Sequence, residues 1–385
     1  MKSMLFIGNY PNPADKYRNV FFQNLIFAIA DQKIRCTVIS PISLTHYRSQ
    51  IKLIPNEDVH YTKRGEQVKV YYPRCVTYSS KKIGILNTCR LSEKSFQRAA
   101  LKMAKRIKTP FDCIYGHFFI SGGLAATLIG RKLNIPAFIA YGECDYESQI
   151  QNPYGNLSHD EIEGLKGIIS VSTDNCNELK QRKLFDNYPV LLAPNGVDLD
   201  SFYRMDKMEC RKKLGIPDDV FVVGFVGGFI ERKGDKRLLA AINQLHEVYG
   251  AFAGKGDIKP TGPRVVFCDA LKHEDIPVFL NACDIFALPT LSEGSCNAII
   301  EAMSCGLPIV SSNLPFNEDI LNEDNSIRID PSNIDEISHA IQELKDDKEL
   351  RRKLSTGALE TAKKLTIEER SNKIINFIET CIQKQ

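Results

Sequence analysis

No stretch of this sequence approaches the roughly 20 consecutive apolar residues that span a bilayer, and its twelve cysteines include no C-x-x-C pair. No Cys/His cluster has zinc-site spacing either, which argues against structural zinc modules and thioredoxin-like redox proteins. The opening residues MKSMLFIGNYPNP predict a strand followed by a turn and not a signal peptide. We therefore expect a cytoplasmic protein with reduced, mostly buried thiols.

Two phosphate-binding fingerprints are also missing. The P-loop pattern G-x-x-x-x-G-K-[ST] does not occur, and neither GNYPNP nor GFVGG matches G-x-G-x-x-G. No aromatic-rich RNA-binding pattern or recognition-helix signature accompanies the basic residues, so we expect no nucleic-acid partner.

What the sequence does contain is a repeated alternation of strands and helices. At 385 residues, with 43% apolar and 25% charged residues, the chain suits two globular domains. Short apolar runs alternate with helical segments, which predicts α/β domains with doubly wound parallel sheets. The expected strands are 4–8, 36–40, 112–117, 136–141, 167–172, 190–193, 220–227, 264–269, 284–289 and 308–312, and the expected helices are 19–32, 121–133, 235–249, 275–282 and 367–383. Two such domains in tandem predict a cleft at the carboxyl ends of their strands.

Charge is distributed unevenly along the chain. Residues 1–200 carry a net charge of +8 and the remainder −5, and residues 81–108 hold nine basic residues and one acidic residue. Within that stretch Phe96, Ala100, Met103 and Ile107 recur at helical spacing, and the basic residues lie mostly elsewhere around the helix (Lys94, Arg98, Lys102, Lys105, Arg106). The stretch is either a solvated helix face or a patch that contacts an anionic membrane or a lipid-linked phosphate.

The segment LSEGSCNAIIEAMSCGLPIVSS (291–312) places Glu293 and Glu301 across a loop-to-helix junction. The free N–H groups of the helix start near Ser295 favour an anion such as a diphosphate. On this segment alone, a capping glutamate plus a solvent-facing one explains the pair equally well. A second segment, FVVGFVGGFIERKGDKRLLAAI (221–242), places Arg232 and Lys233 beside a glycine turn at a helix start, an arrangement suited to phosphate oxygens.

Together these segments resemble the retaining glycosyltransferases of family 4, the glycosyl transferases group 1, which have the GT-B fold. The matching pieces are VSTDNCNEL (171–179), APNGVDLDSF (193–202), VGGFIERKG (226–234) and CDIFALPTLSEGSCNAIIEAMSCGLPIV (283–310). FIGNYPNP, IYGHFFISGGLAA and AYGECD are most similar to the branch for teichuronic acid and capsular polysaccharide synthesis.

The resemblance implies two Rossmann-like domains facing a central cleft. Residues 1–200 would form the acceptor-side domain, residues 201–365 the nucleotide-sugar-binding domain, and residues 366–385 a C-terminal helix packing back on the first domain.

The resemblance also implies roles for individual residues in the second domain. Glu301 would bind the ribose hydroxyls, Glu293 the donor sugar, and Lys233 and Arg232 the diphosphate. The neighbouring residues that would line the nucleotide site are Gly228, Gly294, Ser295, Cys296 and Asn297. Gly228 stands where the family often has an arginine, and Arg232 would replace that cation.

In the first domain, His117 matches a family histidine that contacts the donor sugar or acceptor, although a lone histidine is often structural. Glu143 and Asp145 would line the acceptor side. Lys16 and Arg18 would also belong to the acceptor side. Asn19 stands where a glycine of the first loop is expected, so any contact of that loop with the donor phosphate would come from Lys16 or Arg18.

We expect a retaining, hexosyltransferase-type enzyme that moves a sugar from a nucleotide-sugar, taken to be a UDP-sugar, to a hydroxyl of a saccharide or lipid-linked acceptor in cell-surface polysaccharide synthesis. Cations and a helix start supply the positive charge, so no metal or other cofactor is expected. Asp198-Leu199-Asp200 resembles a metal-binding D-x-D triplet but follows Asn195-Gly196, which favours turn chemistry. The alternatives are a sugar-nucleotide epimerase of the same architecture and a non-catalytic sugar-nucleotide-binding subunit.

Overall fold

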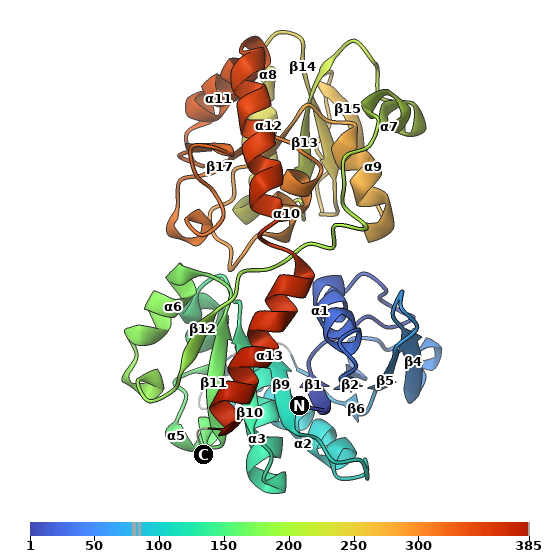
Figure 1. Ribbon diagram of the computed structural model, residues 1–385, viewed down its shortest axis with the longest axis vertical. Coiled ribbons are helices and arrows are strands. Elements are labelled where there is room, and N and C mark those ends of the chain that lie inside the picture. The colour runs from blue at the N-terminus through green and yellow to red at the C-terminus, as the bar shows by residue number, and fades with distance from the viewer. Residues whose placement is uncertain (79–81, 84–85, 384–385) are drawn as a thin grey trace. The chain divides into compact units, whose positions relative to one another are not determined.

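The computed structural model describes residues 1–78, 82–83 and 86–383. Residue contacts divide the chain into two compact units (Figure 1). Unit 1 comprises Met1–Pro194 and Arg370–Gln385, and unit 2 comprises Asn195–Glu369.

Unit 1 is built on an eight-stranded sheet with the order β12-β11-β10-β9-β1-β2-β5-β4. Neighbouring strands run parallel except the edge pair β4–β5, which is antiparallel. Every residue of β1, β9 and β10 is buried, as in strands covered on both faces. The strands of the large sheet are β1 (Ser3–Ile7), β2 (Arg35–Ile39), β4 (Glu57–Tyr61), β5 (Gln67–Tyr71), β9 (Cys113–His117), β10 (Ala137–Tyr141), β11 (Leu165–Ser170) and β12 (Val190–Leu192).

Two small pairs of strands and a set of helices complete this unit. The pairs are β3 (Ile42–Ser43) with β6 (Arg74–Cys75) and β7 (Lys82–Ile83) with β8 (Leu86–Asn87). The helices are α1 (Val20–Ala30), α2 (Thr88–Ala104), α3 (Leu124–Leu133), α4 (Asn152–Tyr154), α5 (His159–Ile162), α6 (Thr173–Lys180) and, from Arg370 onward, α13 (Ile367–Gln383). Helix α13 buries Ile374 and Ile378, and its Phe377 ring packs 6.1 Å from that of Phe138.

Unit 2 is a six-stranded, all-parallel sheet with the order β15-β14-β13-β16-β17-β18. The strands are β13 (Phe221–Val226), β14 (Val248–Ala253), β15 (Val265–Asp269), β16 (Ile285–Leu288), β17 (Ile309–Ser312) and β18 (Ser326–Ile329). The helices are α7 (Lys207–Leu214), α8 (Asp235–Asn243), α9 (Ile276–Asn281), α10 (Asn297–Ser304), α11 (Ile334–Asp346) and α12 (Lys348–Ala362). Helices α8 and α12 pack on α11, while α7 packs on α9 (Figure 1).

The strand order of unit 2 fixes where a ligand is expected. Numbered within the unit it reads 3-2-1-4-5-6, the order of doubly wound nucleotide-binding sheets. The winding direction reverses between β13 and β16, and ligands bind such sheets at the carboxyl ends of the strands on either side of this switch point. The loops that follow β13 and β16 are those that carry the two charged sequence segments.

The α/β class and the parallel sheets are confirmed, and the expected closing helix 367–383 matches α13. The expected helix 235–249 is wrong in its second half, because α8 ends at Asn243 and Val248 begins β14. The antiparallel edge strand β4 was not expected. Within the described residues, no helix combines the length and apolar content needed to cross a membrane.

Candidate functional site

Glu293 is the centre of a charged cluster in unit 2. The residue lies in the loop after β16, and its side chain is only 9% exposed. Oε1 of Glu293 lies 2.5 Å from Nζ of Lys233 and 2.9 Å from Nη1 of Arg232. The hydroxyl of Thr290 also donates to Oε1 at 2.9 Å. The structure thus brings together three of the residues singled out in the sequence.

The electrostatics of this cluster favour a bound anion. Burial on its own would lower the pKa of Lys233, but the charge and hydrogen bond of Glu293 counter this effect, and that pKa is raised. Lys233 is therefore a cation at neutral pH. Since two cations face one carboxylate, the cluster keeps a net positive charge.

Gly234 allows the two loops to meet. Its φ of +80° is in the left-handed region, and a Cβ there would lie 2.3 Å from the carbonyl oxygen of Pro289. The N–H of Leu291 donates to the carbonyl of Arg232 at 2.8 Å across the same junction. A side chain at position 234 would push the Arg232–Lys233 turn away from the loop that carries Glu293.

Helix α10 begins beside this cluster. Its N-cap is Cys296, which is 3% exposed and makes no side-chain cap hydrogen bond, so the first-turn N–H groups lack a cap from this residue. Burial raises the pKa of the Cys296 thiol to about 11, so the thiol is neutral. The helix starts at Asn297, slightly later than expected, and Ser295 is held by Asn195, whose amide Nδ2 donates to its carbonyl at 3.1 Å. Gly294 is buried and Asn297 is half-buried.

Glu301 lies one turn into α10 and pairs with His273, a residue that no sequence motif singles out. Nε2 of His273 is 3.0 Å from Oε1 of Glu301. Burial works to lower the pKa of His273, but the hydrogen bond and charge of Glu301 reverse this and raise it. The ring of Phe202 packs edge-on against His273 at 5.2 Å. Glu301 is therefore ordered by a partner, with its side chain 14% exposed.

Gly228 lies in the turn after β13, close to the residues that follow β14. A Cβ at Gly228 would meet only the Lys255 carbonyl oxygen, at 3.7 Å. The same carbonyl accepts a hydrogen bond from the N–H of Phe229 at 2.7 Å. A Cβ at Gly254 would lie 1.8 Å from the Gly227 oxygen, so the ends of β13 and β14 are in close contact.

In unit 1, His117 ends β9 and is buried in an aromatic cluster. Its ring stacks on Phe22 at 4.1 Å and lies 4.5 Å from that of Phe118. Burial, with a smaller effect of the Arg370 charge, lowers the pKa of His117 to about 3, so the ring is neutral. Neither ring nitrogen finds a hydrogen-bond partner within the described residues.

The two acidic residues after β10 bind backbone groups. Glu143 is buried, and its carboxylate accepts from the N–H of Phe119 at 2.6 Å, which fixes the turn after β9. Burial raises the pKa of Glu143 to about 7. Asp145 accepts from the N–H of Ser148 at 2.7 Å and so caps a local turn.

The first loop of unit 1 exposes Lys16 and half-buries Arg18, whose Nη1 donates to the hydroxyl of Tyr47 at 3.0 Å. Asp198 accepts from the N–H of Asp200 at 3.0 Å and from the hydroxyl of Ser201 at 2.6 Å, which confirms the interpretation of that triplet as a turn. Among the residues that the structure describes, no three His, Cys, Asp or Glu side chains gather as a metal-ligand set.

Solved structures share this architecture over the whole chain. The sucrose-phosphate synthase of Thermosynechococcus elongatus superimposes with a TM-score of 0.78 at 17% identity, with complete coverage of both chains. HepE of Anabaena, in complex with UDP-glucose, gives a TM-score of 0.68 at 16% identity and covers 99% of this chain and 100% of its own. The chain therefore has the GT-B fold, a pair of Rossmann-like α/β domains.

Unit 2 carries the match to a known family. Residues 206–361 match the family model described as Glycosyl transferases group 1. TuaC of Bacillus subtilis, named as a teichuronic acid biosynthesis glycosyltransferase, is 26% identical over 255 residues. That match covers 63% of this chain and 64% of TuaC, so the chain spans just under two thirds of this relative.

Proposed function

We propose that this protein transfers a sugar from a nucleoside-diphosphate sugar to a hydroxyl acceptor, with retention of the anomeric configuration and without a metal ion. The observation that carries the proposal is the cluster of Lys233, Arg232 and Glu293 beside the start of α10, at the switch point of a parallel sheet. It joins two cations, the first turn of a helix and a buried carboxylate in one place.

The roles follow from charge and position. Lys233, Arg232 and the first turn of α10 stabilise the negative charge that develops on the departing diphosphate, and one such donor is commonly worth about 3–4 kcal/mol. Glu293 accepts hydrogen bonds from hydroxyls of the donor sugar. Glu301 accepts from the ribose hydroxyls, with His273 holding its carboxylate in place.

The donor and acceptor classes rest on the relatives. We take the donor to be a UDP-sugar, because HepE was solved with UDP-glucose in the same fold. We take the product to be a cell-surface polysaccharide, since TuaC is named for teichuronic acid synthesis. The exposed basic residues of α2 support an acceptor carried at an anionic membrane surface; they are Lys94, Arg98 and Lys102.

Replacing Glu301 tests the nucleotide site. In Glu301→Ala the ribose loses about two hydrogen bonds, so UDP affinity should fall by roughly 1–3 kcal/mol, about 5- to 150-fold. In Glu301→Gln, which keeps one acceptor oxygen, UDP affinity should fall less. Isothermal titration calorimetry of the full chain measures the change.

Glu323→Ala is the matched control, because Glu323 is exposed and lies in a loop of unit 2 before β18. It should bind UDP like the unaltered protein. Unchanged UDP affinity in Glu301→Ala would remove Glu301 from the site.

A further inference from the structure

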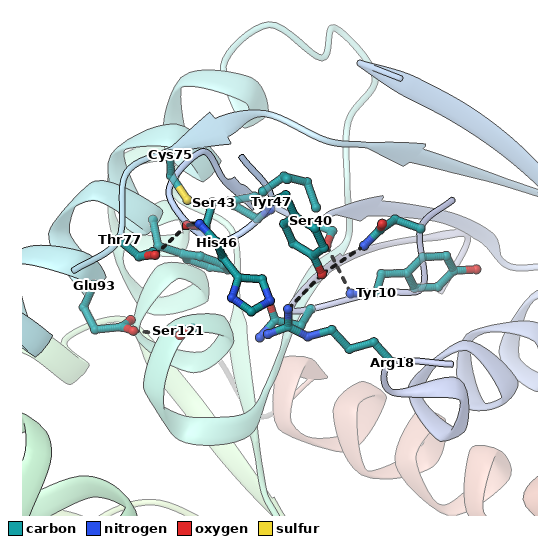
Figure 2. A pocket seen from close by; sticks show the side chains of 15 residues that line it. Tyr10, Arg18, Ser40, Ser43, His46, Tyr47, Cys75, Thr77, Glu93 and Ser121 are labelled. Carbon is teal, nitrogen blue, oxygen red and sulfur yellow. Dashed lines mark hydrogen bonds between the residues drawn. The ribbon is translucent and has the colours of Figure 1, made fainter. Parts of the chain in front are cut away.

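A polar cavity lies within unit 1, apart from every residue assigned a role above except Arg18 (Figure 2). Its volume is about 200 Å³. The loops after β1 and β2 form part of its wall, together with β3 and the residues that follow it. The end of β6 with the segment after it, α2 and the turn after β9 form the rest. The residues used below are Arg18, Ser43, His46, Thr77, Glu93 and Ser121.

Glu93 brings an unsatisfied carboxylate oxygen to this cavity. The residue is only 7% exposed, and its Oε1 accepts a hydrogen bond from the hydroxyl of Ser121 at 2.7 Å. Its Oε2 is buried and has no hydrogen-bond partner among the described residues. A buried carboxylate oxygen without a partner is costly, so its persistence indicates that a ligand supplies the missing donor.

Ser121 is held in place for this contact by an unusual backbone. Its φ of +70° is rare for a residue other than glycine, and Phe118, three residues earlier, also has a positive φ of +63°. Such conformations persist only where the surrounding structure enforces them, and they cluster at active and ligand-binding sites.

Arg18 supplies a cation to the same cavity. It donates to the hydroxyl of Tyr47, and no carboxylate pairs with it in the described part of the chain. His46 also lines the cavity and packs edge-on against Tyr47 at 4.7 Å. In Figure 2, Arg18 and Tyr47 lie on the side of the cavity away from Glu93 and Ser121. The hydroxyls of Ser43 and Thr77, which are hydrogen-bonded to one another, also belong to the polar lining.

The size and polarity of the cavity define the class of ligand. At about 30 Å³ per water, its volume equals that of six or seven water molecules and is below the range of drug-sized pockets. It suits one sugar ring, and its lining offers donors and acceptors for hydroxyls. The cation at one end and the unsatisfied carboxylate oxygen at the other require a ligand with two chemically different ends.

We propose that this cavity binds one sugar residue of the acceptor that carries a negatively charged substituent, with Arg18 binding the substituent and Glu93 and Ser121 binding a hydroxyl. The assignment to the acceptor rests on the proposed glycosyltransferase function. A carboxylate and a phosphate share the required chemistry, because each presents two oxygens that a guanidinium binds through two parallel N–H groups.

The protonation of Glu93 fits a hydroxyl partner. Burial raises the pKa of Glu93 to about 7. The hydrogen bond from Ser121 lowers this pKa and offsets only part of the effect of burial. Near neutral pH the carboxyl group is thus present in both forms, and either form hydrogen-bonds a hydroxyl.

The test measures binding of three sugars to the full chain by titration NMR: methyl glucoside, methyl glucuronide and glucose 6-phosphate. At least one charged sugar should bind about tenfold more tightly than the neutral one, and the stronger of the two identifies the substituent as carboxylate or phosphate. Arg18→Gln should abolish that preference, whereas Glu93→Gln should weaken the binding of all three sugars alike. Arg64→Gln, which removes an exposed cation between β4 and β5 outside the cavity, should change nothing.

Equal binding of all three sugars, or an Arg18→Gln effect no larger than that of Arg64→Gln, would overturn the proposal. UDP is titrated into the same samples. Binding of UDP without preferential binding of either charged sugar refutes this inference and leaves the proposed function standing, while absence of UDP binding refutes the proposed function itself.

Discussion

At the scale of single residues, the pair formed by His273 and Glu301 couples the proposed ribose site to pH. Because the pKa of folded His273 is raised above its ordinary value of about 6.5, the folded state binds this proton more tightly than the unfolded chain. The pair therefore stabilises the fold fully below pH 6.5, and this contribution is lost as pH rises through the raised pKa.

Replacement of His273 should expose this dependence. We expect His273→Gln to lower the free energy of unfolding by about 0.5–1 kcal/mol at pH 5.5, an amount reduced by the partial exposure of the ring, and by less at pH 8.5. Urea denaturation across this range measures the difference, with His339→Gln, an exposed histidine of α11, as control. A difference that stays constant with pH would show that the pair contributes no proton linkage.

Single residues also show where sequence reasoning stopped. The segments around Lys233 and Glu293 were recognisable because each carries its own local pattern of glycine and charge. Glu93 was counted only as the single acidic residue of a basic stretch, because its environment comes from Ser121 and Arg18, far away in the sequence. His273 carries no local signal for the same reason, since only folding places it against Glu301.

At the scale of elements, the connection from β13 to α8 depends on Gly234. We expect Gly234→Ala to destabilise the protein by about 3 kcal/mol, because it combines a left-handed backbone, costing about 1–2 kcal/mol, with overlap against the Pro289 carbonyl. Gly215 also has a positive φ of +67°, but a Cβ there meets nothing within 4 Å. Gly215→Ala should therefore cost only the backbone part, about 1–2 kcal/mol.

Urea denaturation of both variants separates the two contributions. Equal losses would mean that the junction between the loops tolerates a side chain and is not fixed by the Pro289 contact.

Element boundaries were predictable only where the pattern was strong. Helix α13 has a sustained helical period, and its bounds agree with the prediction. The predicted helix 235–249 overlaps the start of β14, because no glycine or proline follows Asn243 to indicate that the helix ends there. The chain turns there through Glu247, which adopts a positive φ of +54°. This conformation is uncommon for glutamate and could not be predicted from the residue type.

At the scale of the whole molecule, each unit has a parallel sheet whose switch point gathers loops from distant parts of the chain. In unit 2 these loops follow β13 and β16, and they carry Arg232, Lys233 and Glu293. In unit 1 the equivalent strands are β1 and β9, and the loops beyond them lead to Arg18 and Ser121. Alternation of strands and helices predicted the parallel sheets, but the strand order that makes these loops neighbours is visible only in the fold.

The central claim is that unit 2 binds a nucleoside diphosphate through protein cations alone. Thermal unfolding of the full chain with UDP, GDP, ADP or CDP, each with and without EDTA, tests it most directly. At a ligand concentration of 100 Kd, binding stabilises the folded state by about 2.7 kcal/mol, which raises Tm by several degrees. We predict that one nucleotide, UDP, gives this shift and that EDTA leaves it unchanged. A shift with none of the four, or one that disappears with EDTA, would contradict the roles of Lys233, Glu293 and Glu301.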